Sequence, residues 1–242
     1  MDSHADIKPG DYAWRTLYRI GGVAPWVILG CFLVQILVMA SGEPFPATSE
    51  DWLSLLHRNR VLGLLYFNVL DIFSIPLMGP ILLALCIALR KGRESLMLVA
   101  AFLGTLGIAV FVTPRAGILT AGISLSDRYT AAATEGLREQ ILTAGDGIFA
   151  MGQAAPQTTG FFFIALAVLI LSWVMLRSPV FGKAAAATGI LAAFITAADY
   201  FLAIFAPAPA NALLLVAILA WTAWWILISR KLLRLAAGGV VT

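Results

Sequence analysis

The chain has 242 residues, of which 61% are hydrophobic and 12% are charged, with a formal net charge of +3 and a mean hydropathy of +0.93. Because soluble domains carry roughly a quarter charged residues, this composition indicates an integral membrane protein. The small net charge gives no reason to expect a nucleic-acid partner. The two cysteines, Cys31 and Cys86, lie inside apolar runs at different predicted membrane depths, so we predict no disulfide between them.

Six apolar runs approach the roughly 20 residues that a transmembrane helix needs. We therefore predict an all-α fold, a polytopic membrane bundle of six transmembrane helices that forms one domain over residues 1–242. An amphipathic helical cap with a break at Gly145 or Gly147 is expected on the outer side, over 125–153. The predicted spans are 17–40, 61–89, 95–124, 155–176, 184–205 and 212–228.

The connection between the first two spans, residues 41–59, contains two helix-breaking prolines, Pro44 and Pro46. Thr48 and Asp51 after them match a capping box, which predicts the start of a short helix at the membrane interface.

The connections at the two ends of the predicted bundle differ in their lysine and arginine content. These residues gather in the N-terminal segment, in the 90–93 and 177–183 connections and at the C-terminus, whereas the other connections mix cations with acids. The positive-inside rule then places both termini in the cytoplasm and the two larger connections outside.

The second span carries Asp71, ten residues from its predicted outer end, and the third span carries Arg115 at a similar predicted depth. A charge in hydrocarbon is costly, so opposite charges at one depth are expected to pair inside the bundle. Asp199 on the fifth span lies only slightly nearer the outside. We therefore predict a cluster of Asp71, Arg115 and Asp199 in the outer half of the bundle.

Other polar residues fall on the faces that lead to this cluster. Asn68, Asp71 and Ser74 are spaced by three, which puts them on one side of the second span. Small residues are typical of close helix contacts in membranes. We predict one such stripe at Ala185, Gly189, Ala192, Thr196 and Asp199, which turns Asp199 towards the bundle, and another at Thr113, Gly117 and Ala121. The side chains expected to complete an outward-leaning pocket are Gln35, Tyr66, Asn68, Gln153, Gln157 and Tyr200.

Simpler interpretations exist for each feature. The Asp71–Arg115 pair could only hold two helices in register, and Asp199 could reach the outer interface beside Tyr200. Trp221, Trp224 and Trp225 are most simply an interfacial aromatic belt.

Three functions remain open. The first is binding, transport or sensing of a small molecule or lipid in the pocket. The second is a membrane-embedded enzyme for an isoprenoid or lipid, with Asp71 or Asp199 as general acid. The third is an accessory subunit of a larger membrane complex or homo-oligomer. With His4 and His57 as the only histidines, we expect no haem, no metal and no other cofactor.

Three segments, LYRIGGV, LSDRYTAAATEGLREQILTAGDGIF and MLRSPVFGKAAAATGILA, resemble a bacterial family of uncharacterised six-span membrane proteins, a domain of unknown function. The resemblance covers about a third of the chain. It implies the same six-span architecture in a bacterial cytoplasmic membrane, and it transfers no catalytic residue.

Overall fold

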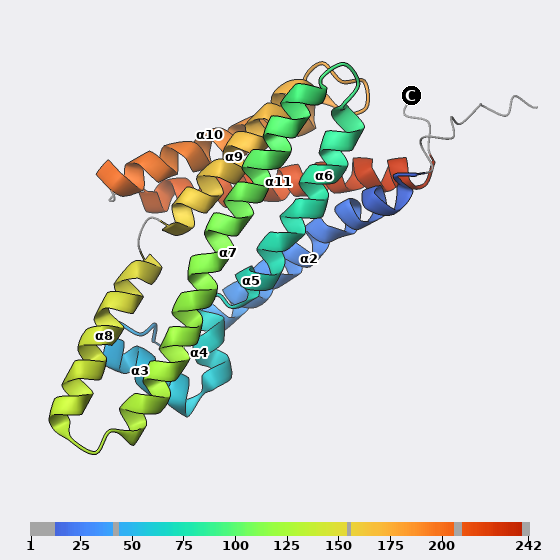
Figure 1. Cartoon of the computed structure of the whole chain (residues 1–242). Coiled ribbons are helices and arrows are strands. Elements are labelled where there is room, and N and C mark those ends of the chain that lie inside the picture. The colour runs from blue at the N-terminus through green and yellow to red at the C-terminus, as the bar shows by residue number, and fades with distance from the viewer. Residues whose placement is uncertain (1–12, 41–43, 154–155, 206–209, 239–242) are drawn as a thin grey trace, which may run out of the picture.

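The computed structural model describes residues 13–40, 44–153, 156–205 and 210–238, and the regular elements within these ranges are all helices (Figure 1). The all-α class is thus confirmed. In chain order the elements are α2 (Arg15–Met39), α3 (Ser49–Arg58), α4 (Arg60–Tyr66), α5 (Leu70–Ser74), a 3-10 turn η1 (Ile75–Leu77), α6 (Met78–Leu89), α7 (Glu94–Ala131), α8 (Glu135–Gln153), α9 (Pro156–Met175), α10 (Lys183–Phe205) and α11 (Ala210–Ala236).

Five stretches are helical, long and apolar enough to cross a membrane, which indicates a membrane protein. They are α2, the run from α5 through α6, α7, most of α10 and the second part of α11. The sixth predicted span, 155–176, corresponds to α9, whose described apolar part, Thr159–Met175, is shorter than the others. Six spans therefore remain a prediction.

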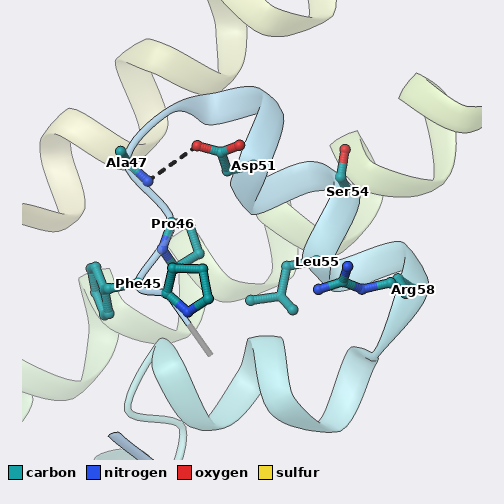
Figure 2. A pocket seen from close by; sticks show the side chains of 8 residues that line it. Phe45, Pro46, Ala47, Asp51, Ser54, Leu55 and Arg58 are labelled. Carbon is teal, nitrogen blue, oxygen red and sulfur yellow. Dashed lines mark hydrogen bonds between the residues drawn. The ribbon is translucent and has the colours of Figure 1, made fainter. Parts of the chain in front are cut away.

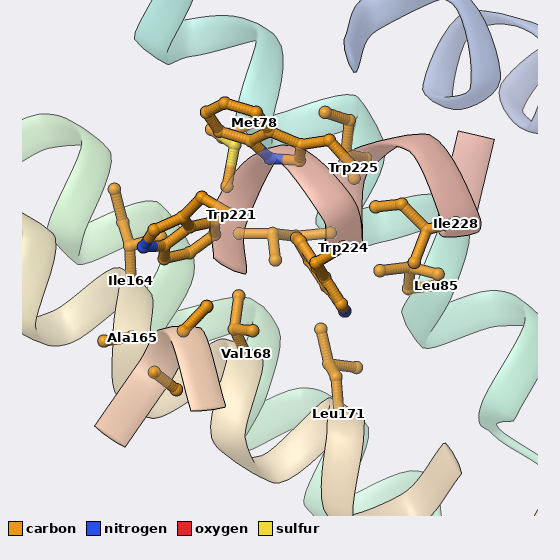
Figure 3. Close-up of a cluster of buried hydrophobic side chains, with 14 of the residues drawn as sticks. Met78, Leu85, Ile164, Ala165, Val168, Leu171, Trp221, Trp224, Trp225 and Ile228 are labelled. Carbon is orange, nitrogen blue, oxygen red and sulfur yellow. The ribbon is translucent and has the colours of Figure 1, made fainter. Parts of the chain in front are cut away.

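The apolar core of the bundle lies where α11 meets α6, α9 and α10 (Figure 3). Trp221, Trp224 and Trp225 point into this core and are buried among residues such as Val168 and Leu171. Their prediction as an interfacial belt is wrong, because the last span turns its tryptophans towards its helical neighbours and away from the membrane surface.

Helices α7 and α9 pack along each other (Figure 1), and glycines let their backbones touch. A Cβ atom placed on Gly107 would lie 2.6 Å from the Gly160 carbonyl oxygen, and one on Gly160 would lie 2.7 Å from Phe111 Cβ. The small stripe predicted around Gly117 is wrong, because Gly117 is exposed and has no neighbour within reach of a Cβ.

The stripe on the fifth span is confirmed in its first part, because α10 buries Ala185, Gly189 and Ala192 against the bundle. At Gly189, a Cβ would overlap Ser172 of α9 and Trp224 of α11. Further along α10, the Thr196 hydroxyl accepts a hydrogen bond of 2.9 Å from Trp221 Nε1. These contacts tie α9, α10 and α11 together at small residues.

Helix α7 has 38 residues, about 57 Å at ~1.5 Å per residue, which is nearly twice the ~30 Å hydrocarbon thickness. Its exposed face changes along this length. Leu98 and Phe102 are 72% and 66% exposed, whereas the exposed residues of the second half include Thr120 and Ser124. Apolar side chains on an outer face suit lipid, so this change indicates that α7 leaves the hydrocarbon partway along. Helix α7 continues to Ala131. Residues 125–131, which were predicted as part of the cap, therefore belong to α7 and not to α8.

A second, smaller apolar cluster lies at the far end of α7, where α3, α4 and α8 surround it. The predicted capping box starts α3, with the Thr48 hydroxyl accepting from the Asp51 N–H at 3.1 Å. The predicted break in α8 is wrong, because the helix is continuous through Gly145. This glycine lets α8 approach α3, since a Cβ there would already lie 3.4 Å from Ser49 Cβ.

Candidate functional site

The second predicted span is interrupted at residues 67–69, between α4 and α5. Asn68 has φ +52° and is the one described non-glycine residue with positive φ. Its N–H donates to the Leu65 carbonyl at 2.9 Å, and the Val69 N–H donates to the Leu64 carbonyl at 3.0 Å. This is the Schellman pattern that ends helices, with asparagine in the left-handed position that glycine usually takes. The prediction of a single transmembrane helix over 61–89 is therefore wrong in its first part, and the helical stretch long enough to cross a membrane begins at Leu70.

The backbone carbonyl of Phe67 lies at the break, and the guanidinium group of Arg115 on α7 contacts it. Arg115 Nη1 donates to this oxygen at 3.1 Å and lies 3.3 Å from Asp71 Oδ2. The predicted Asp71–Arg115 pair is thus confirmed, and one guanidinium nitrogen both caps the broken helix and neutralises the carboxylate. The sequence alone did not predict the contact to Phe67, because it depends on where the helix ends.

Gln35 of α2 completes the constellation by donating from Nε2 to Asp71 Oδ1 at 3.0 Å. Gln35 is 5% exposed, and Asp71 and Arg115 are each 8% exposed. Asp71 therefore accepts a neutral hydrogen bond at one carboxylate oxygen and faces a charged guanidinium at the other. Three helices that are distant in sequence, α2, α5 and α7, are joined at this point.

Arg115 keeps one donor without an acceptor. Its Nε is buried and has no hydrogen-bond partner in the described part of the chain. On one side the guanidinium lies over the Phe111 ring, 5.0 Å from its centroid. A buried N–H without an acceptor costs ~1–3 kcal/mol, so an acceptor from outside the chain would be stabilising there.

The constellation lies near one end of the apolar helices. The candidate span that contains Asp71 begins at Leu70, so Asp71 is at its edge and not ten residues inside. Between Asp71 and Arg90 lie 18 residues without Asp, Glu, Lys or Arg, and between Glu94 and Arg115 lie 20. These lengths correspond to about 27 and 30 Å, the thickness of the hydrocarbon layer. The ion pair therefore lies where the uncharged apolar stretches of both helices end.

Other predicted site residues fall in two groups. Tyr66 is buried beside the break and its ring stacks on Phe45 at 5.7 Å, and Asn68 forms the break itself. Asp199 makes no ion pair among the described residues, and α10 packs chiefly on α9 and α11. Tyr200 stacks on Phe162 at 4.8 Å.

The predicted three-residue cluster is therefore an Asp71–Arg115 pair without Asp199. The side chains of Gln153 and Gln157 lie outside the described part of the structure.

An aromatic cluster, which the sequence analysis missed, lies directly beyond the break. Phe67 packs on Trp52 at 4.1 Å and on Phe149 at 5.4 Å between ring centroids. The backbone carbonyl of Phe67 therefore faces Arg115 while its side chain anchors α3 and α8. No spacing in the sequence indicates this, because Trp52 belongs to α3, Phe67 to the break and Phe149 to α8.

Figure 2 shows a hollow of about 500 Å³ beside α3, lined by residues 44–47, Asp51, Ser54, Leu55 and Arg58. The Asp51 carboxylate in it already accepts from the Ala47 and Thr48 N–H groups. Hydrogen bonding to Thr48 and Ala47 lowers the pKa of Asp51, so the carboxylate serves the start of α3. The hollow contains none of the predicted site residues.

Comparison with protein-family models, with curated proteins and with solved structures finds no match to this chain. The resemblance to a bacterial six-span family stays a prediction. The fold and the site define a class: a helical membrane protein with an interrupted helix and a buried ion pair at the interruption.

Proposed function

We propose that this protein binds the polar end of a lipid or small amphiphilic molecule at Gln35, Asp71 and Arg115. In this proposal six helices cross a bacterial cytoplasmic membrane, with α9 as the sixth, both termini are cytoplasmic, and α3, α4 and α8 form a cap outside. The site then lies at the outer membrane boundary, where headgroup and upper-chain oxygens are available as hydrogen-bond acceptors.

The observation that carries the proposal is the Arg115 Nε donor, which is buried and has no acceptor among the residues that the structure describes. Around it, the neighbouring groups already have partners: Asp71 accepts a hydrogen bond from Gln35 and pairs with Arg115, and the Phe67 carbonyl accepts from Arg115. An ester, phosphate or hydroxyl oxygen of a ligand would fill the remaining position. Interrupted membrane helices are tolerated where the irregular backbone is buried in protein or lines a cavity, which suits a binding site.

The experiment is native mass spectrometry of the purified full chain, comparing wild type with Arg115→Gln and Asp71→Asn. The matched control is Arg128→Gln, which removes an exposed arginine from the same helix. We expect a lipid or small molecule on wild type and on the control, and at least a tenfold lower occupancy on folded Arg115→Gln.

Equal occupancy on all four proteins would overturn the proposal, and so would a wild type that carries nothing after gentle extraction and that takes up no lipid from an added membrane extract. The second outcome would favour the role of accessory subunit. Thermal unfolding of each variant shows whether a lost ligand reflects a lost fold. If Arg115→Gln does not fold, Gln35→Leu, which leaves the ion pair in place, takes its position in the comparison.

A further inference from the structure

At the end of the bundle away from Arg115, the first and last described helices lie side by side in antiparallel directions. Trp26 Nε1 of α2 donates to Ser229 Oγ of α11 at 2.8 Å, and that hydroxyl donates to the Gly22 carbonyl at 2.6 Å. Further along, a Cβ on Gly238 would meet the guanidinium of Arg15. These contacts place Arg19 of α2 level with Arg234 of α11.

The α6–α7 connection comes to the same place. The Arg90 guanidinium at the end of α6 lies over the Trp14 ring at the start of α2, 5.4 Å from its centroid. Gly21 of α2 is close enough to α6 that a Cβ there would lie 3.1 Å from the Pro80 carbonyl oxygen. Three helix ends therefore bring arginines together at one edge of the molecule.

This end of the described chain is strongly one-sided in charge. It carries ten Lys and Arg residues and a single acid, Glu94: the cations are Arg15, Arg19, Arg90, Lys91, Arg93, Arg177, Lys183, Arg230, Lys231 and Arg234. Arg19, Arg230 and Arg234 are exposed, and none of them forms an ion pair with a described carboxylate. A cluster of like charges needs counter-ions, and at a membrane surface lipid phosphates can supply them.

We propose that the arginines around the α2–α11 contact, Arg19, Arg90, Arg230 and Arg234, bind the phosphate headgroup of an anionic phospholipid. Guanidinium groups match phosphate oxygens in two-point hydrogen bonds, and partial exclusion of water strengthens them. Beside these arginines the outer face of α2 is apolar, with Ile20 and Val23 exposed, so acyl chains can lie along it while the phosphate sits at the helix ends.

The site is independent of the proposed outer site, because it uses none of the same residues and lies at the end of the bundle where α6 ends and α7 begins. The test therefore leaves Arg115 and Asp71 unchanged. The full chain is titrated in detergent with phosphatidylglycerol, with phosphatidylcholine as the neutral-headgroup comparison, and bound lipid is counted by native mass spectrometry. The test variant is Arg19→Gln/Arg234→Gln.

The matched control is Arg177→Gln/Lys183→Gln, which removes two charges from the same end of the molecule but from the α9–α10 connection. We expect wild type and control to prefer phosphatidylglycerol. We expect the test variant to bind it about 25-fold more weakly, at about fivefold for each cation removed. A conservative variant, Arg19→Lys/Arg234→Lys, should keep most of the preference.

Equal losses in test and control variants would overturn the proposal, since charge alone would then explain the preference. No preference for the anionic lipid in wild type would also overturn it. Inorganic phosphate distinguishes the two sources of the same chemistry: displacement of the lipid by a few millimolar phosphate would show a free-anion site and refute the lipid assignment.

Discussion

The close crossing of α7 and α9 gives the sharpest test of the packing. Gly107 is buried in α7, and a Cβ at that position would lie 2.6 Å from the Gly160 carbonyl oxygen and 2.8 Å from the Ile164 backbone nitrogen. Real Cβ atoms almost never lie closer than 3.0 Å to another group. Both neighbours belong to the backbone of α9, so no side-chain rotation removes the overlap and the helices have to separate.

We therefore expect Gly107→Ala to destabilise the fold. Overpacking of this kind typically costs ~1–3 kcal/mol. For a chain of about this length, each 1 kcal/mol shifts the unfolding midpoint by about 2–4 °C. The expected decrease is thus about 5 °C, and its cause is a single methyl group.

The matched control is Gly117→Ala in the same helix, at an exposed position with no atom within 4 Å of a new Cβ. There, alanine is expected to be neutral or stabilising by up to ~1 kcal/mol, because it favours the helical backbone. The assay is thermal unfolding of the three proteins in one detergent at one scan rate, which keeps irreversible steps comparable. Midpoints of Gly107→Ala and Gly117→Ala within 1 °C of each other would refute the backbone contact of α7 and α9.

Three further predictions concern single contacts. Because φ is +52° at Asn68, Asn68→Gly should leave the unfolding midpoint unchanged or raise it, while Asn68→Val should lower stability by ~1–2 kcal/mol. A more stable valine variant than glycine variant would contradict the interrupted helix. The pKa of Asp51 is lowered in the folded chain, so its contribution is present at neutral pH and is lost as the pH falls below about 4. Over this fall in pH, amide hydrogen-exchange protection in the first turn of α3 should decrease in wild type but stay constant in Asp51→Ala. Ser229→Ala leaves the Trp26 indole N–H without its acceptor and should lower the midpoint, whereas Ser229→Thr, which keeps the hydroxyl, should restore part of it.

The sequence was sufficient to predict features that depend on composition and local pattern. The apolar runs predicted the helical class, and Thr48 with Asp51 predicted the start of α3. The Asp71–Arg115 pair was also predictable, because two opposite charges stand alone in neighbouring apolar runs and each needs a partner. The same logic failed for Asp199, because charge matching does not say which helices are neighbours.

Features set by tertiary contacts were not predictable in the same way. The signal for the interruption is one residue, Asn68, within a continuous apolar run, and hydropathy outweighs it in any window long enough to detect a span. Likewise, the close contact predicted at Gly117 occurs at Gly107 of the same helix, because the position of α9 decides which glycine it meets. The aromatic residues Trp52, Phe67 and Phe149 meet because of the interruption, so their cluster was equally hidden.

The position of the ion pair also separates its structural role from the proposed one. An ion pair at mid-membrane must satisfy nearly every donor and acceptor within the protein, because hydrocarbon offers no partner. Asp71 has a hydrogen bond from Gln35 and an ion pair with Arg115, whereas the buried Arg115 Nε has no acceptor among the described residues. A purely structural pair gains nothing from such a donor. At the boundary of the apolar helices, where lipid and solute oxygens are within reach, the same donor is useful, and this difference favours a ligand at Arg115.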